Sequence, residues 1–194
     1  MKALTQVAAV AALAFSASAA NATVFINDET PSSGLQSFSY TFASDASVDI
    51  TIGVSNADDT VGLGTQFHTS WGGIGAGLPD ITLGDSGCPV DTSSYTNAYG
   101  EAGTCGDVAS ITAGVLAGDS LSFDWDYTSN DGGAFHDFSF IQINDDTGAE
   151  LYYEVLAQQC AAGDASCPGT VSEPGVLVLF GLGLALLGLR RRLA

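Results

Sequence analysis

Apolar and polar side chains alternate along this chain with a period of two residues. The clearest case is residues 121–127, which read LSFDWDY. In a β-strand, successive side chains point to opposite faces, so this segment has one apolar face and one polar face. A strand with one wet face is typical of an antiparallel sheet, because parallel strands are usually buried on both faces.

The same period recurs after residue 23, and no stretch long enough for a domain helix has a period of 3.6. Nine segments carry it: residues 23–26, 38–42, 48–54, 66–71, 80–83, 108–112, 121–127, 135–143 and 150–156. Turn-forming Gly, Asp, Asn and Ser separate them. The pattern predicts an all-β protein with an antiparallel β-sandwich or jelly roll. It weakens between residues 62 and 106, where we expect a long loop region.

Charge is distributed unevenly along the chain. All 22 carboxylates lie between residues 23 and 189, a span that contains no lysine or arginine. Nucleic-acid binding is therefore excluded, because no cation is available to neutralise phosphates. A lysine Schiff base and an arginine clamp on phosphate are excluded as well. The four basic residues are Lys2, Arg190, Arg191 and Arg192.

The N-terminal residues 1–22 have the layout of a secretory signal peptide. Lys2 precedes an apolar stretch, and Ala20-Asn21-Ala22 supplies small residues where signal peptidase cleaves. We therefore expect export of the chain, with cleavage after Ala22, and an oxidising environment for its body.

Near the C-terminus, a short polar motif precedes an uncharged run at residues 176–189 and a cluster of arginines. As a helix this run would be about 22 Å long, short against a hydrocarbon core of ~30 Å. We therefore expect a transmembrane helix that anchors the protein to the inner membrane only transiently. The arginines are expected on the cytoplasmic side.

The C-terminal order of motif, apolar helix and arginine cluster resembles the PEP-CTERM sorting signal of Gram-negative bacteria. The matching residues are Ser172, Glu173, Pro174, Arg190, Arg191 and Arg192, with Ser172 in place of the usual first proline. The resemblance implies recognition by an exosortase and delivery to the cell surface or extracellular matrix. The expected organisation is a signal peptide (1–22), an extracellular β-sandwich domain (23–160), a tether (161–171) and the sorting signal (172–194).

Residues 117–127, followed by residues 137–140, support a second resemblance. These segments are similar to the choice-of-anchor β-sandwich domains that often precede PEP-CTERM tails. The resemblance covers roughly thirty residues and implies a fold, but no defined activity.

The body contains an even number of cysteines, Cys88, Cys105, Cys160 and Cys167. In an exported chain we expect two disulfides, for which three connectivities exist. Sequential pairing would close two local loops that are poor in apolar residues. A zinc site is the alternative, but no Cys-x-x-Cys spacing supports it.

Clusters of oxygen-bearing side chains at the ends of expected strands suggest calcium as the one candidate cofactor, because calcium takes six to eight oxygen ligands. The candidate ligands are Asp124, Asp126, Asp131, Asp145 and Asp146. Neither cluster matches an EF-hand loop, and plain turns in which Asp caps the backbone are the alternative.

Two patterns suggest catalysis. Residues 84–89 resemble the Gly-Asp-Ser-Gly-Gly-Pro motif of chymotrypsin-like proteases, but the only upstream histidine, His68, lies 18 residues before Ser86. We therefore do not expect a protease.

Asp124 and Asp126, at i and i+2 of one strand, would lie about 6–7 Å apart, within the range that glycosidases use. The two histidines, His68 and His136, are expected to be surface or packing residues rather than ligands or bases.

The sequence thus predicts a non-catalytic protein of the cell surface or exopolysaccharide matrix, with an adhesive or carbohydrate-binding role. Exposed aromatic residues of the loop region are the candidate ligand contacts: Trp71, Tyr95 and Tyr99. The alternatives are an extracellular glycan hydrolase that uses paired carboxylates and a calcium-stabilised structural module.

Overall fold

The computed structural model describes residues 22–27, 30–57, 66–75, 78–84, 87–129 and 135–160. These residues form ten strands. Their bounds are β1 Val24–Ile26, β2 Gln36–Thr41, β3 Ala46–Asn56, β4 Gln66–Gly73, β5 Ile81–Gly84, β6 Val90–Asp91, β7 Cys105–Val115, β8 Ser120–Thr128, β9 Phe138–Asp145 and β10 Glu150–Gln159.

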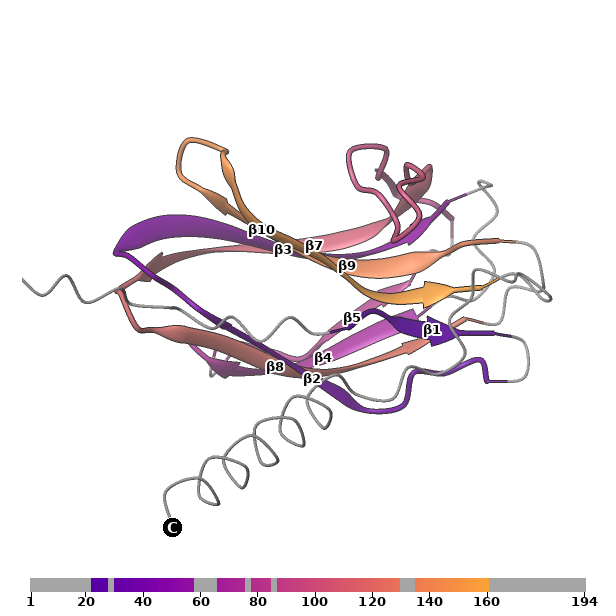
Figure 1. Cartoon of the computed structure of the whole chain (residues 1–194), viewed down its shortest axis with the longest axis horizontal. Helices are drawn as coiled ribbons and strands as arrows, with labels where there is room; N and C mark the ends of the chain where they lie inside the picture. The colour runs from indigo at the N-terminus through magenta and orange to yellow at the C-terminus, as the bar shows by residue number, and fades with distance from the viewer. Residues whose placement is uncertain are drawn as a thin grey trace, which may run out of the picture.

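The strands form two sheets that pack face to face, so the predicted β-sandwich is confirmed. The larger sheet has the order β1-β10-β9-β3-β7-β6 and the smaller has the order β2-β8-β4-β5. Figure 1 shows the two layers, with β3, β7, β9 and β10 in one and β2, β4 and β8 in the other. Pairing between the described strands is antiparallel except that β1 runs parallel to β10.

The core lies between the inner faces of the two sheets. The alternation predicted for β8 is observed, and its apolar side chains are all buried: Leu121, Phe123, Trp125 and Tyr127. From the other sheet, β3 buries Val48, Ile50, Ile52 and Val54. Burial of each such side chain contributes about 1.5–3 kcal/mol relative to exposure, so these two strands are central to stability.

Each of the nine predicted segments overlaps an observed strand, and the differences lie at the strand ends. The strand predicted at 135–143 begins only at Phe138, and that predicted at 108–112 extends over β7 from Cys105 to Val115. The two-residue strand β6 was not predicted. It pairs with β7 through Val90 opposite Gly106 and Asp91 opposite Cys105, and two residues are too few to show a period.

A disulfide joins Cys88 to Cys105, with their Cα atoms 5.1 Å apart. It confirms the first of the sequential pairs considered for the sequence. Because Cys105 begins β7 and Cys88 lies two residues before β6, the bond fixes the short strand β6 against the sheet edge. Cys160 follows β10 and is buried, whereas Cys167 lies outside the described residues.

The loop between β6 and β7, residues 92–104, covers part of the outer face of the larger sheet. The ring of Tyr95 stacks on that of Phe140 in β9, with centroids 4.0 Å apart. The hydroxyl of Tyr153 in β10 donates to Thr96 O at 2.6 Å and accepts from Thr96 N at 3.1 Å. The loop therefore encloses a second apolar cluster, and this explains why Phe138 and Phe140 are buried on the sheet face opposite the main core.

The expected signal peptide, except for Ala22, lies outside the described residues, as do the tether and the sorting signal. Among the residues that are described, no helix is long and apolar enough to cross a membrane. The expected transmembrane helix at 176–189 therefore stays a prediction.

Gly53 in β3 provides a test of the second cluster. A Cβ atom at this position would lie 2.3 Å from Cζ of Phe140 and 3.0 Å from Cγ1 of Val108. We expect Gly53→Val to displace the Phe140 ring and lower the free energy of unfolding by about 1–3 kcal/mol, as overpacking does.

Gly114 in β7 is the matched control, because a Cβ atom there meets nothing within 4 Å. Gly114→Val should leave the free energy of unfolding unchanged or raise it slightly, since glycine is unfavourable in a strand. Urea denaturation measures both variants. An equal effect of the two substitutions would contradict the proposed packing of Phe140 against Gly53.

Candidate functional site

The outer face of the smaller sheet brings together polar side chains from neighbouring strands. In the ladder between β4 and β8, His68 lies opposite Asp126 and Ser70 lies opposite Asp124. The same alternation that buries Phe123 and Trp125 directs Asp124 and Asp126 to this outer face. The carboxylates that were singled out in the sequence therefore lie side by side with a histidine and a serine of β4.

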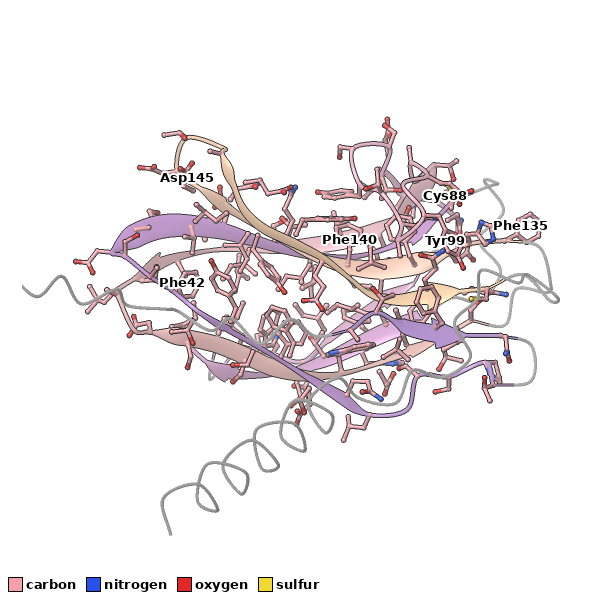
Figure 2. All side chains as sticks on the ribbon, viewed as in Figure 1. Phe42, Cys88, Tyr99, Phe135, Phe140 and Asp145 are labelled. Carbon is pink, nitrogen blue, oxygen red and sulfur yellow. A yellow bond between two sulfur atoms is a disulfide. The ribbon has the colours of Figure 1, made fainter. Side chains whose placement is uncertain are left out.

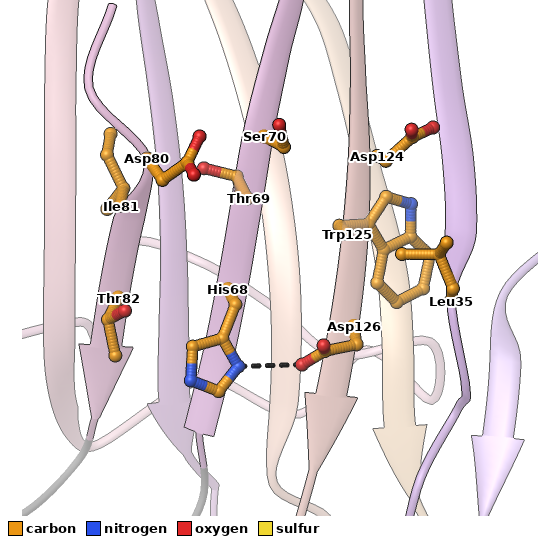
Figure 3. Close-up of a pocket in the computed structure, with 10 residues that line it drawn as sticks. All are labelled: Leu35, His68, Thr69, Ser70, Asp80, Ile81, Thr82, Asp124, Trp125 and Asp126. Atoms are coloured by element: carbon orange, nitrogen blue, oxygen red, sulfur yellow. Dashed lines mark hydrogen bonds and ion pairs between the residues drawn. The ribbon is translucent and has the colours of Figure 1, made fainter.

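Residues of the flanking strands β5 and β2 lie next to the two pairs His68–Asp126 and Ser70–Asp124. Thr82 of β5 lies opposite His68, and Ser37 of β2 lies opposite Asp124. A groove with a volume of about 280 Å³ crosses this face (Figure 3). It is lined by Leu35, His68, Thr69, Ser70, Asp80, Ile81, Thr82, Asp124, Trp125 and Asp126.

Two hydrogen bonds orient the carboxylates of the groove. His68 Nδ1 lies 2.7 Å from Asp126 Oδ1, and the side chains are 42% and 41% exposed. The hydroxyl of Ser37 donates to Asp124 Oδ1 at 2.6 Å. Such exposed pairs add only about 0–1 kcal/mol to stability, so their main effect here is on orientation. Within the described part of the chain, no hydrogen bond to the second oxygen of either carboxylate is found, and each such oxygen can accept hydrogen bonds from a ligand.

Aliphatic side chains complete the groove. Leu35 is 75% exposed, unusually open for a large apolar residue. Ile81 also borders the groove, but it lies opposite the inward-facing Thr69 and packs against the core. In Figure 3 these two residues lie on either side of His68 and Asp126. The hydrogen-bonding groups of the groove are therefore bordered on one side by the exposed apolar side chain of Leu35.

Two of the remaining calcium candidates, Asp145 and Asp146, lie apart from the groove. Asp145 ends β9, and Figure 2 shows it at the end of the sandwich away from Cys88 and Tyr99. Its Oδ1 accepts hydrogen bonds from Thr147 N, Thr147 Oγ1 and Ala149 N at 2.6–2.9 Å. This is the capped turn that was the alternative to a calcium site, and Asp146 lies beside it. Among the described residues no group of three potential metal ligands is found, and Asp131 lies outside them.

Trp71, one of the three expected aromatic contacts, is partly buried rather than fully exposed. This residue lies within β4 on the same face as the buried Phe67 and Thr69, and its ring centroid is 5.2 Å from that of Phe123. Trp71 is partly buried and packs against the core. Alternation along β4 explains the position, because 67, 69 and 71 share the inner face.

The two tyrosines also pack against other side chains rather than forming an exposed platform. Tyr95 covers Phe140, and burial raises the pKa of the Tyr95 hydroxyl. The ring of Tyr99 stacks on Phe25 of β1 and meets His136 edge-on, with centroids 6.2 and 5.1 Å apart. These contacts join segments distant in sequence, so they leave no local signal.

A second carboxylate–histidine pair joins the loop between β6 and β7 to the segment that precedes β9. Glu101 Oε2 is 2.8 Å from His136 Nδ1 and accepts from Asn97 Nδ2 at 2.7 Å. The side chain of His136 is only 16% exposed. In agreement with the expectation for the histidines, this one acts in packing, since it holds the loop against the segment that leads into β9. Glu101 was not anticipated from the sequence.

The protease-like motif at residues 84–89 contains a disulfide-bonded cysteine, and part of the motif lies outside the described residues. Cys88, which stands where the motif has its last glycine, is bonded to Cys105. Asp85, Ser86 and the sorting residues 172–174 and 190–192 are not described.

No known protein family matches this chain, and no curated protein matches it. One solved structure, titled "Structure of the N-terminal domain of PorA", is similar over 72% of this chain and 87% of its own. The sequence identity is 15% and the TM-score is 0.30. A likeness of this size carries no inference about function.

The turn at Asp145 gives a pH-dependent prediction. Hydrogen bonds from Thr147 and Ala149 lower the pKa of Asp145 below its ordinary value of 3.8. The stabilisation should be complete above pH 3.8 and lost as the pH falls through the lower pKa of the folded state.

The measurement compares the urea midpoints of the wild type and Asp145→Asn. The wild type should be the more stable at pH 6, and the difference should shrink at pH 3. A difference that is unchanged or larger at pH 3 would show that the charged carboxylate does not cap this turn.

Proposed function

We propose that this protein is a non-catalytic component of the cell surface or exopolysaccharide matrix, and that the groove on its smaller sheet binds polysaccharide. The observation that carries the proposal is the groove itself. It presents the carboxylates of Asp124 and Asp126, with His68 and Ser70, on a regular sheet face that is open to solvent.

The groups in the groove match the chemistry of a sugar chain. Carboxylates and hydroxyls exchange hydrogen bonds with sugar hydroxyls, and the exposed side chain of Leu35 offers apolar surface to the C–H face of a sugar ring. An open groove can also accept a long polymer, whose ends need not enter. Because no lysine or arginine occurs between residues 23 and 189, we infer that the polysaccharide is neutral or bears amines rather than acidic groups.

An extracellular location is supported by the chain itself. The disulfide between Cys88 and Cys105 is typical of an oxidising compartment. The signal-peptide pattern and the PEP-CTERM-like tail add the expected route: signal peptidase, transient anchoring in the inner membrane, and processing by an exosortase of a Gram-negative bacterium.

A glycan hydrolase is the second candidate, because the structure places Asp124 and Asp126 in one groove with His68. If the imidazole donates from Nδ1 to Asp126, its Nε2 is an acceptor, and Nε2 has no hydrogen-bond partner within the described part of the chain. The open setting favours binding, since glycosidases commonly need one carboxyl group held protonated by an apolar environment.

The test replaces both groove carboxylates, as Asp124→Asn with Asp126→Asn. Asp49, whose carboxylate accepts from Thr112 on the other sheet at 2.6 Å, provides the matched control Asp49→Asn. Calorimetric titration with a neutral glucan should show at least about a tenfold loss of affinity in the double variant, equivalent to ~1.4 kcal/mol. The control should bind as the wild type does.

The same samples distinguish the two candidates through release of reducing sugar. The proposal expects no release from the wild type. Release of reducing sugar that disappears in the double variant would establish the hydrolase instead. Equal binding of glucan by all three proteins would show that the groove is not the binding site.

A further inference from the structure

Strand β7 is paired along one edge and open along most of the other. Its residues pair one for one with β3 from Cys105 to Val115. On the opposite edge, β6 pairs only with Cys105 and Gly106. Within the described residues no further strand pairs with this edge, so it is open from Asp107 to Val115.

The exposure of side chains agrees with an open edge. Ile111 packs against the core but is partly exposed, whereas its ladder partner Ile50 is 1% exposed. The neighbouring sheet contacts the beginning of the edge, where Gly84 N donates to Asp107 Oδ2 at 3.4 Å.

The composition of this edge favours addition of another strand. Residues 108–116 read VASITAGVL, without a charge or a proline and with four β-branched residues. Soluble proteins usually protect long edge strands with lysine, proline, inward-pointing charges or β-bulges. None of these interrupts β7 here, and its register with β3 is continuous. The backbone N–H and C=O groups along this edge can therefore pair with an added strand over residues 107–115.

Carboxylates flank both ends of the open edge. Asp107 stands at its beginning. At its far end, Asp119 Oδ2 accepts from Leu116 N and Asp45 Oδ1 accepts from Ala117 N, both at 2.8 Å. With no lysine or arginine between residues 23 and 189, a second copy of this chain would bring like charges together. A partner with basic residues at its ends would instead complement them.

We propose that the free edge of β7 binds an extended, uncharged, β-branched segment of another exported polypeptide, flanked on both sides by lysine or arginine. The segment adds as a strand beyond β7 and lengthens the larger sheet. This site lies on a different sheet from the groove, so it does not depend on polysaccharide binding.

The test uses the exported protein and a labelled peptide, Lys-Thr-Val-Thr-Ile-Thr-Val-Thr-Lys, in a fluorescence anisotropy titration at low and high salt. One control peptide carries proline in place of isoleucine, which prevents strand pairing. Another carries glutamate in place of both lysines. We expect that only the lysine peptide binds and that high salt weakens its binding. Binding should also protect backbone amides within residues 107–115 from hydrogen exchange.

Charge variants locate the site. Asp107→Lys should weaken binding of the lysine peptide at least about tenfold. Asp146→Lys changes the net charge equally at the turn between β9 and β10, separated from β7 by β9 and β3, and should have little effect. The proposal is overturned if the proline peptide binds equally well, if exchange protection appears elsewhere, if both variants behave alike, or if the chain associates with itself instead of binding the peptide.

Discussion

The pleat of β8 couples the core of this protein to its candidate binding face. Leu121, Phe123, Trp125 and Tyr127 are buried between the sheets, and the residues between them face outward. The groove is therefore built on the most constrained strand of the smaller sheet, because a shift of one residue would expose the aromatic side chains and bury Asp124 and Asp126. Core packing thus fixes the positions of the groove carboxylates.

The larger sheet uses its outer face differently. Near Gly53 the ring of Phe140 lies over the strand and Tyr95 stacks on that ring. The disulfide joins the segment just before β6 to the first residue of β7, at the two ends of the region that carries this loop. Toward Val115 the outer face stays polar, with Thr51 and Ser110 sharing a hydrogen bond of 2.8 Å. One end of this sheet is consequently covered by a loop, whereas along the side edge of β7 no strand of the described residues pairs beyond Gly106.

The parts of the structure that follow from the sequence are those governed by local periodicity. Alternation at residues 48–54 and 121–127 was sufficient to predict strands and their buried faces, and it placed Asp124 and Asp126 together. The partner of Asp126 could not be predicted, because the register that sets His68 opposite it depends on contacts 58 residues apart. The partial burial of Tyr95 could not be predicted for the same reason, because its ring stacks on Phe140 of the distant strand β9.

The central claim is that the polar face of the smaller sheet is the binding surface of an exported domain. The most direct measurement is a map of amide chemical shifts in the isotope-labelled protein during titration with a neutral glucan. We predict that the shifts concentrate on the outward residues of β4, β5 and β8, around His68 and Asp126. Shifts confined to the loop around Tyr95 and Tyr99, or no shifts at saturating glucan, would contradict it.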